Sequence, residues 1–468
     1  MSLMTSLTLP RAALTPTRRT LALFTVLAAQ CMFAMDLLIV VVALPHMQQD
    51  LGFSPASLTW VLNAFGLAFG GLLLLGGRLS DMIGPVRAFR AGLVVFVLAS
   101  VLGGFAHTQW ALVAARVFQG IGAALAGPSV LALVMIMARN ATEQARGMAL
   151  FIAVSTVGAS AGLILGGVLT EYFSWRWALL INVPVGGLVV AIIGRLVVNT
   201  PAKQARLDVI GALTATLGSG ALVYGFIRAA EIGWARTGTI ASFAAATLLF
   251  AIFIRTESRH PSPLLDLRLL RHPARLGGLA VMALIVGVHF SVLFILVQYF
   301  QRVLHYSPIF AGLAYLPMTA TVFAINQFMP RLIRLFGIRP LLITGSLLVA
   351  ISLLCFAALD EHDGYASAVL IPLIVHAAGI ALVFAPGTVA IMQGVPKAQA
   401  GAASGLLQMD QQIGGALGIA AITSMYAFAA TPGQYASGLP AAFAGGALIA
   451  LAAMLIAWKV FREDTASA

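Results

Sequence analysis

The sequence predicts an all-α membrane protein that crosses the bilayer fourteen times. Hydrophobic residues make up 60% of the 468 residues and charged residues 9%, whereas soluble domains average about 45–50% and about 25%. A chain this apolar cannot present the polar surface that a soluble protein needs, so soluble enzymes, disordered proteins and disulfide-rich secreted scaffolds are excluded. The apolar residues also gather in runs of about 20, the length with which a helix crosses a hydrocarbon core.

Fourteen such runs follow one another along the chain, and each is expected to form one transmembrane helix. The first run is too long for the core of a signal peptide, so we expect it to be retained. The runs cover residues 20–44, 58–79, 86–106, 110–138, 146–170, 177–198, 207–229, 237–256, 276–299, 308–329, 338–359, 366–392, 400–428 and 438–461.

The basic residues predict the orientation of these spans. With the N-terminus inside, 22 of the 27 Lys and Arg residues fall in inner segments, whereas Arg176, Arg228, Arg236 and Arg302 fall in outer ones and Arg116 lies within a span. Positive charge is enriched in cytoplasmic loops. One miscounted span would move all later loops to the other side and abolish this bias. We therefore expect an even number of spans, with both termini in the cytoplasm.

The net charge of +12 does not indicate nucleic-acid binding. The chain has only three lysines, and its arginines are scattered singly or in pairs between apolar runs, unlike the basic blocks of nucleic-acid-binding proteins. The two cysteines, Cys31 and Cys355, both lie in apolar runs, so neither a disulfide nor a cysteine-based metal site is predicted. No nucleic-acid partner is expected.

An internal repeat divides the chain into two halves. The segment Leu51–Pro55 recurs as Leu304–Pro308, and at the same offset Arg78-Leu79 and Gly84 recur as Arg331-Leu332 and Gly337. This maps the second span onto the tenth in the same orientation, as in transporters built from parallel six-helix repeats. The predicted division is a six-helix half at 20–198, a two-helix insertion at 199–257, a cytoplasmic loop at 258–275 and a second six-helix half at 276–461.

Several motifs resemble those of the major facilitator superfamily. Gly77–Arg87 is similar to the family's signature between spans 2 and 3, and Leu112–Gly122 to its span-4 motif. Asp36–Pro45, and Trp175–Trp177 followed by Ile181–Pro184, resemble motifs of the fourteen-span drug:proton antiporter branch. The resemblance covers about residues 20–461. It implies a secondary transporter with two six-helix halves and two extra central helices, working on small molecules and protons in a lipid bilayer without a cofactor.

Span 5 matches the antiporter motif of this branch only in part. Gly158, Gly162, Gly166 and Gly167 are present, but Leu163 stands where the resemblance expects a proline. The first three glycines share one helix face, where missing side chains let another backbone approach closely. Helix packing is the favoured interpretation. The role that the resemblance implies, sealing the cavity against leak, would work through the same packing.

Asp36 and Arg116 are the candidate proton-coupling residues. A charged side chain at the centre of a bilayer costs about 3 kcal/mol on insertion scales, so such residues are by default functional. Arg116 lies about 9 Å and Asp36 about 12 Å from the outer ends of their spans, so an interaction is allowed. Gln119 shares the face of Arg116. The resemblance assigns the matching arginine a role in proton transfer; the alternative is packing and charge neutralisation.

Candidate substrate-binding residues come from the second half of the chain. Asp410, His376 and His289 lie deep in spans 13, 12 and 9, which line the cavity in the fold that the resemblance implies. A lone buried histidine is more often a satisfied structural group than a ligand, so this alternative stays open for both histidines. Weaker candidates for polar contacts are Asn326, Gln327, Gln298 and Gln412.

Gly77, Asp81, Gly84 and Arg87 are expected to form a short cytoplasmic turn. Gly84 permits the tight bend. Asp81 is expected near the start of span 3, where a helix N-terminus favours a carboxylate. The resemblance implies a charge lock that holds the cytoplasmic side closed, and helix capping is the alternative. The second repeat has Arg334 at the position of Asp81, so the lock would be asymmetric.

No enzyme is predicted. Gly158–Gly162 matches the G-x-S-x-G pattern, but that motif needs a strand-to-helix elbow, whereas these residues lie within an apolar helix. None of the lysines follows a glycine, so the chain encodes no phosphate-binding loop of an ATPase, and no metal motif occurs. The favoured function is proton-coupled export of amphipathic drugs or toxic small molecules by alternating access in the cell inner membrane. The alternatives are export or import of one endogenous metabolite and, less favoured, a channel or an intramembrane enzyme.

Overall fold

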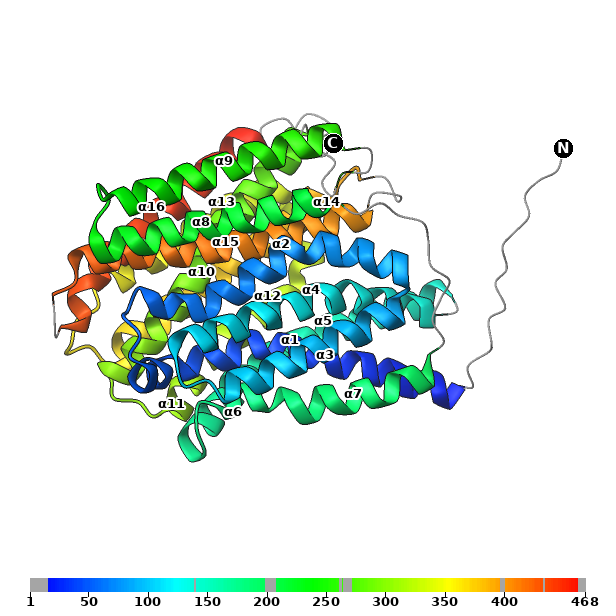
Figure 1. Cartoon of the computed structure of the whole chain (residues 1–468). Helices are drawn as coiled ribbons and strands as arrows, with labels where there is room; N and C mark the ends of the chain where they lie inside the picture. Colours follow the sequence, from blue (N-terminus) through cyan, green and yellow to red (C-terminus); the bar gives the residue numbers. More distant parts are fainter. Residues whose placement is uncertain are drawn as a thin grey trace.

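The structure is a computed structural model that describes residues 16–138, 140–197, 208–260, 263, 272–395, 400–431 and 434–461. Within these residues, fourteen helical segments are long and apolar enough to cross a membrane. They run side by side along one direction (Figure 1). Helices satisfy their own backbone hydrogen bonds, as a hydrocarbon environment requires. The predicted all-α fold and the number of spans are confirmed.

The first six spans are formed by α1 to α7, because the sixth is split into a short α6 and a longer α7. The first helix has 36 residues and ends at Leu51, seven residues beyond the predicted end of the first run. The helices are α1 (Pro16–Leu51), α2 (Trp60–Ile83), α3 (Pro85–Gly104), α4 (Gln109–Met137), α5 (Ala141–Tyr172), α6 (Trp177–Leu180) and α7 (Asn182–Leu196).

Two further spans separate this half from the second one, in which α11 and α12 together form one span. Short helical turns at Ser57–Thr59, Tyr365–Val369 and Tyr435–Gly438 precede α2, α14 and α16. The helices are α8 (Val209–Ile232), α9 (Thr237–Arg259), α10 (Pro273–Arg302), α11 (Pro308–Leu313), α12 (Leu316–Phe336), α13 (Ile338–Phe356), α14 (Leu370–Met392), α15 (Ala400–Ala429) and α16 (Leu439–Val460).

Single glycines join α2 to α3 and α12 to α13. Gly84 has φ 89° and Gly337 has φ 77°, values that a residue with a Cβ rarely adopts. These glycines are the two that the sequence repeat aligns. The two halves therefore make the same turn at the same point of the repeat.

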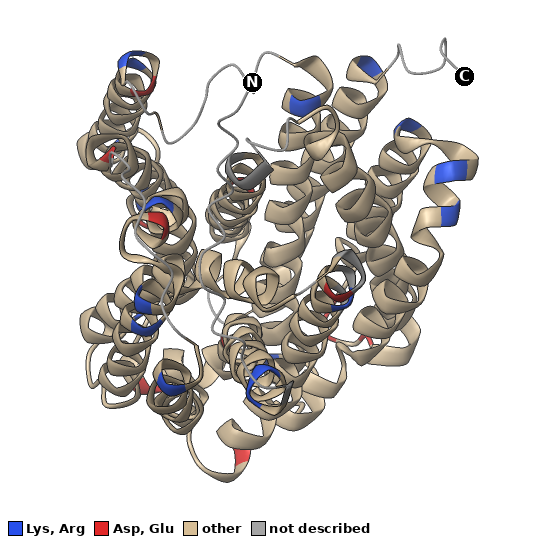
Figure 2. Ribbon diagram, turned by 90° about the vertical axis from the view of Figure 1, so that its right-hand side faces the viewer, with Lys and Arg blue, Asp and Glu red and all other residues tan. Residues whose placement is uncertain are grey.

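The helix ends lie at two faces of the bundle. We call the end at which α1 begins and α16 ends the terminal end, and the other the opposite end (Figure 1). Figure 2 looks onto the terminal end and shows Lys and Arg at helix ends around the whole bundle. Of the basic residues predicted to be inside, these lie outside the described residues: Arg11, Arg139, Lys203, Arg206, Arg268, Arg271, Lys397 and Arg462.

The glycine face of α5 packs against α1. A Cβ at Gly158 would lie 2.8 Å from the carbonyl oxygen of Cys31, and one at Gly162 would lie 2.5 Å from that of Met35. Gly166 meets the backbone of Ile39 in the same way. No side chain fits between the two backbones, so the glycines serve helix packing, as the favoured interpretation holds.

The two halves meet across the bundle at two seams. At the opposite end, Gly167 lies against Pro308 and Gly312 against the carbonyl oxygen of Leu163. The residue found in place of the expected proline is thus fully buried at the contact of α5 with α11.

Hydrogen bonds tie the same end together. The Gln301 side chain donates to the carbonyl oxygen of Val42 at 2.8 Å, and the Ile309 amide donates to Glu171 at 3.1 Å. The second seam joins α2 to α15, where Gly66 and Gly70 lie against Gln412. Among the described residues, α3, α4 and α5 make no extended contact with α12, α13 or α14. At the opposite end the halves are therefore joined where α1 and α5 contact α10 and α11.

The two inserted helices lie beside the second seam. Helix α8 packs against both α2 and α15, with Gly71 of α2 against Thr216. The Ser424 hydroxyl of α15 lies 2.7 Å from the carbonyl oxygen of Phe226 in α8 and donates to it. Helix α9 packs mainly on α8. The insertion therefore contacts both halves at once.

The packing of α5 on α1 predicts different tolerances at two adjacent positions. Gly162→Leu is expected to destabilise the protein and lower its transport, since overpacking typically costs about 1–3 kcal/mol. Ala161→Leu is the matched control, because Ala161 is only half-buried and lies off the glycine face. Melting temperature in detergent and efflux at matched expression are the measurements. Equal values for the two variants would contradict the assigned face.

Candidate functional site

A buried ion pair joins α1 to α4. The Arg116 Nη1 atom donates to Asp36 Oδ2 at 2.7 Å, and the two side chains are 1% and 0% exposed. The interaction that the matching depths allowed is therefore present. A buried charge is tolerated only when it is paired and its remaining polar atoms are hydrogen-bonded, so the surroundings of the pair decide how it is held.

The Asp36 carboxylate accepts two further hydrogen bonds. The Asn182 amide donates to Oδ1 at 2.7 Å from α7, and the Gln119 amide donates to the same oxygen at 3.3 Å from α4. The Ser100 hydroxyl of α3 accepts from Gln119 at 2.8 Å and donates to the carbonyl oxygen of Phe96 at 2.8 Å. Side chains of α4 and α7 thus bond the carboxylate of α1 directly, and α3 supports one of them through Ser100.

The Arg116 guanidinium is held on three sides besides the carboxylate. Its Nε donates to the carbonyl oxygen of Val61 at 2.9 Å, and its Nη1 to Gln119 at 2.8 Å. Its carbon lies 4.6 Å from the ring centroid of Phe65, within the range of a cation–π interaction. Both members of the pair are therefore fixed in orientation.

The pair borders a small cavity between the two halves. Arg116, Asn63 and Gly66 line it from the first half, and Phe290 and Gln412 from the second, around a volume of about 30 Å³. Asn63 is fully buried, and both polar atoms of its amide lack a hydrogen-bond partner. Leaving one such group unsatisfied costs about 1–3 kcal/mol. The amide is therefore available to a polar group that enters between the halves.

Sequence reasoning missed part of this site. Asn63 and Ser100 were not singled out, and Asn182 was noted only within a motif of the resemblance. A signal did exist, because all three are polar residues within apolar runs. Many Ser and Thr residues in these helices bond only their own backbone, such as Thr25 to Leu21, so polarity alone does not separate the two groups.

The predicted substrate-binding residues are not gathered in one place. Only Gln412 lines the cavity beside Arg116. His289 and His376 lie together, with ring nitrogens 3.2 Å apart. The Oδ2 atom of Asp410 is buried without a hydrogen-bond partner.

The other predicted polar contacts lie apart from the cavity. The Gln298 amide makes only a long bond of 3.5 Å to the carbonyl oxygen of Phe294, and its Oε1 atom has no partner. Asn326 and Gln327 are exposed on α12.

The alternative role of Asp81, capping the third span, is not seen in the structure. Asp81 lies within the last turn of α2, and the residue that caps α3 is Gly84, which provides no side-chain hydrogen bond. The reason is that α2 continues to Ile83 and α3 begins at Pro85, which leaves one residue for the turn. Asp81 and Arg87 are both exposed at the terminal end, whereas Gly77 lies beside Pro128 of α4.

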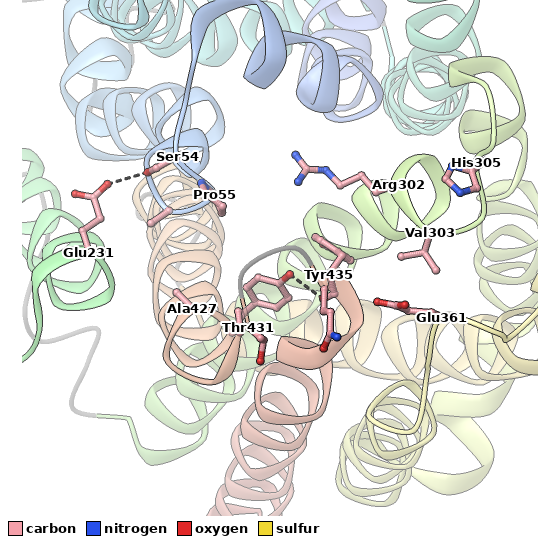
Figure 3. A pocket seen from close by; sticks show the side chains of 14 residues that line it. Ser54, Pro55, Glu231, Arg302, Val303, His305, Glu361, Ala427, Thr431 and Tyr435 are labelled. Atoms are coloured by element: carbon pink, nitrogen blue, oxygen red, sulfur yellow. Dashed lines mark hydrogen bonds between the residues drawn. The ribbon is translucent and has the colours of Figure 1, made fainter.

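A larger pocket of about 880 Å³ opens at the opposite end, between the α1–α2 connection, α8 and the second half (Figure 3). Ser54 donates to Glu231 at 2.9 Å within it. The Arg302 guanidinium lies 5.6 Å from the ring centroid of Tyr435 and bonds Gln48. None of the predicted site residues lines this pocket.

Comparison with known proteins places the chain in a family. Residues 26–419 match the Major Facilitator Superfamily. The Cephamycin export protein CmcT of Amycolatopsis lactamdurans is 35% identical, over 94% of this chain and 91% of the relative. The Puromycin resistance protein pur8 of Streptomyces alboniger is 37% identical, over 87% and 82%. The Methylenomycin A resistance protein of Bacillus subtilis (strain 168) is 31% identical, over 91% of each.

Solved structures of transporters share the fold. The crystal structure of the peptide transporter POT in complex with sulfate superposes with a TM-score of 0.70 over 94% of each chain, at 14% identity. The POT family transporter PepTSo gives 0.68 over 96% of this chain and 99% of that one, also at 14% identity. At sequence identities this low, the similarity shows a shared fold only. The family match and the long alignments with relatives above 30% identity make the chain a fourteen-span member of the major facilitator superfamily, related to antibiotic export and resistance proteins.

Proposed function

We propose that the protein is a proton-coupled exporter of amphipathic drugs or toxic small molecules. The single observation that carries the proposal is the buried Asp36–Arg116 pair beside the cavity between the halves. A carboxylate there can exchange a proton, and its partner Arg116 borders the place where the halves meet. Relatives named for cephamycin export and for puromycin resistance support the class of substrate.

The coupling step follows from the hydrogen bonds of the pair. While Asp36 is ionised, its charge holds Arg116 in a charge-assisted bond, which is about twice as strong as a neutral one. A proton on Asp36 removes that charge, and Arg116 keeps only Val61, Gln119 and the Phe65 ring as partners. The guanidinium then becomes available to the cavity. In this way the Arg116 side chain links proton binding at Asp36 to the contact between the two halves.

Alternating access also needs an orientation. We place both termini in the cytoplasm and the bundle in the cell inner membrane, so that the opposite end, where α1 and α5 contact α10 and α11, faces outward and the terminal end faces inward. The bias of basic residues towards the terminal end supports this orientation. Asp81 and Arg87 of the terminal turn, with Gly77 and Gly84, are then positioned to act when that end closes. We propose that the two six-helix halves move relative to each other. They are the halves of the division into residues 20–198, 199–257, 258–275 and 276–461.

Substrate contacts are proposed from both halves. From the second half we propose Asp410, Gln412, Gln298, His289, His376, Asn326 and Gln327, and from the first half we add Asn63, whose buried amide is unpartnered. One endogenous metabolite as the substrate is the second candidate, because a relative that aligns with 94% of this chain is named for the export of one product. A transport panel of structurally unrelated compounds separates the two, since a dedicated transporter moves only one of them.

The orientation predicts opposite labelling of two engineered cysteines. In a background of Cys31→Ala and Cys355→Ala, we expect a membrane-impermeant maleimide to label His362→Cys in intact cells, because the His362 side chain is 94% exposed at the opposite end. Ser2→Cys is expected to react only after the cells are permeabilised. The reverse pattern would overturn the orientation, and the cysteine-free protein is the control for background labelling.

The coupling proposal predicts a selective loss in Asp36→Asn. The amide keeps the shape and most hydrogen bonds of the carboxylate but cannot exchange a proton. We expect a folded protein whose uncoupler-sensitive efflux falls at least tenfold at matched expression, whereas Asp410→Asn changes apparent affinity. Dye or puromycin accumulation with and without an uncoupler is the measurement.

The double variant Asp36→Asn/Arg116→Gln controls for folding, because it also removes the arginine left without a counter-ion. If its melting temperature recovers while efflux stays low, the loss in Asp36→Asn is one of coupling. Unchanged pH dependence of efflux in Asp36→Asn would instead show that another group carries the proton.

A further inference from the structure

Two histidines of the second half form a hydrogen-bonded pair that the coupling step above does not use. His289 Nδ1 lies 3.2 Å from His376 Nε2, and the two rings stack with an interplanar angle of 15°. His376 is fully buried, whereas His289 is half-buried. The pair joins α10 to α14, and the Oγ atom of Ser352 in α13 lies 3.2 Å from the other ring nitrogen of His376.

The chain of hydrogen bonds has one direction when both rings are neutral. The Ser352 hydroxyl donates to the carbonyl oxygen of Val349 at 2.7 Å, because a carbonyl can only accept. Ser352 therefore accepts from His376 Nδ1–H. A neutral imidazole carries one N–H, so His376 Nε2 is an acceptor and His289 Nδ1 must be the donor. Both Nε2 atoms then lack a proton, and because His376 Nε2 already accepts from His289, the Nε2 atom of His289 is the one left to bind an incoming proton.

The surroundings of the pair are aromatic and uncharged. Phe290 and Phe384 contact the His289 ring, with centroids 5.9 and 6.3 Å away. On the neighbouring helices, Asp410 lies in α15, Cys355 in α13 and Asp36 in α1. In the part of the chain that the structure describes, none of these groups and no Lys or Arg forms a hydrogen bond or an ion pair with either ring.

We propose that His289 and His376 together bind one proton of the transport cycle, in addition to the one on Asp36. The proton adds to His289 Nε2 and makes that ring a cation. The cation can pass its Nδ1 proton along the existing bond to His376 Nε2, which leaves His289 neutral and His376 protonated on both nitrogens. No heavy atom has to move. A second proton would put two positive charges on rings 3.2 Å apart, so the pair holds one.

This assignment rests on the proposed export function and extends it to the second half. Phe290, which contacts His289, also lines the cavity that Arg116 borders. The histidine pair therefore lies one aromatic side chain away from that cavity. Each half then carries one protonatable element near the contact that alternating access must open and close.

A ¹⁵N-histidine spectrum tests the pair without any transport. In lipid nanodiscs we expect both rings to carry their proton on Nδ1 at high pH and to titrate together as one proton as the pH falls from about 8 to about 4. His289→Asn identifies the signals, because the Asn amide keeps the donor at the position of Nδ1 but cannot accept a proton. Rings that stay neutral over this range, or that carry their protons on Nε2, would overturn the proposal and leave a structural link between helices.

Coupled transport gives the second readout. In proteoliposomes clamped at zero membrane potential, the limiting puromycin gradient changes by about tenfold per pH unit for each coupled proton. We expect His289→Asn to lower that gradient tenfold at a pH difference of one unit. His362→Asn, the same change at an exposed histidine, is expected to retain it.

The two failures are distinguishable. If the puromycin gradient of the wild-type protein does not respond to the pH gradient, the proposed function is wrong. The nanodisc titration then still decides whether the pair binds a proton. An equal gradient in wild type and His289→Asn would overturn the coupled role of the pair and leave the role of Asp36 intact.

Discussion

One carboxylate in the hydrocarbon region organises the first half of the molecule. Asp36 has 0% exposure, and an ion in that position is stable only with a counter-charge and full hydrogen bonding. Arg116, Gln119 and Asn182 supply both from α4 and α7. Because α5 packs on α1 through glycines with no side chain between the backbones, the helix that carries the charge cannot turn about its axis independently. The position of Asp36 therefore constrains several helices at once.

The features that could be predicted from the sequence are those that depend on local rules. Spans, their number and the repeated turn at Gly84 and Gly337 follow from local rules, namely the length of apolar runs and the backbone freedom of glycine. The Asp36–Arg116 contact was within reach, since a lone acid and a lone base lay at similar depths. The contacts of Ser100 and Asn182 could not be predicted, because the rotation of each helix about its axis decides which polar residues point inward. A helix that is apolar on all sides gives little indication of that rotation.

Two expectations show where local reasoning ends. The sequence leaves helix capping open as an alternative role for Asp81, but α2 runs on to Ile83, because nothing in its last turn stops the helix before Gly84. In the sequence, His289 and His376 are isolated histidines, and a lone buried histidine is more often a satisfied structural group than a ligand. They lie 87 residues apart in the chain, and only the packing of α10 on α14 makes them one hydrogen-bonded unit with Ser352.

The position of α8 has a consequence for what surrounds the centre of the protein. In a bundle without α8 and α9, the line along which α2 meets α15 would face the acyl chains of the bilayer. Here α8 lies over that line, in contact with both helices. The flank of the bundle next to Asn63 is thus covered by protein instead of lipid, so a helix shields the cavity between the halves from the acyl chains on that side.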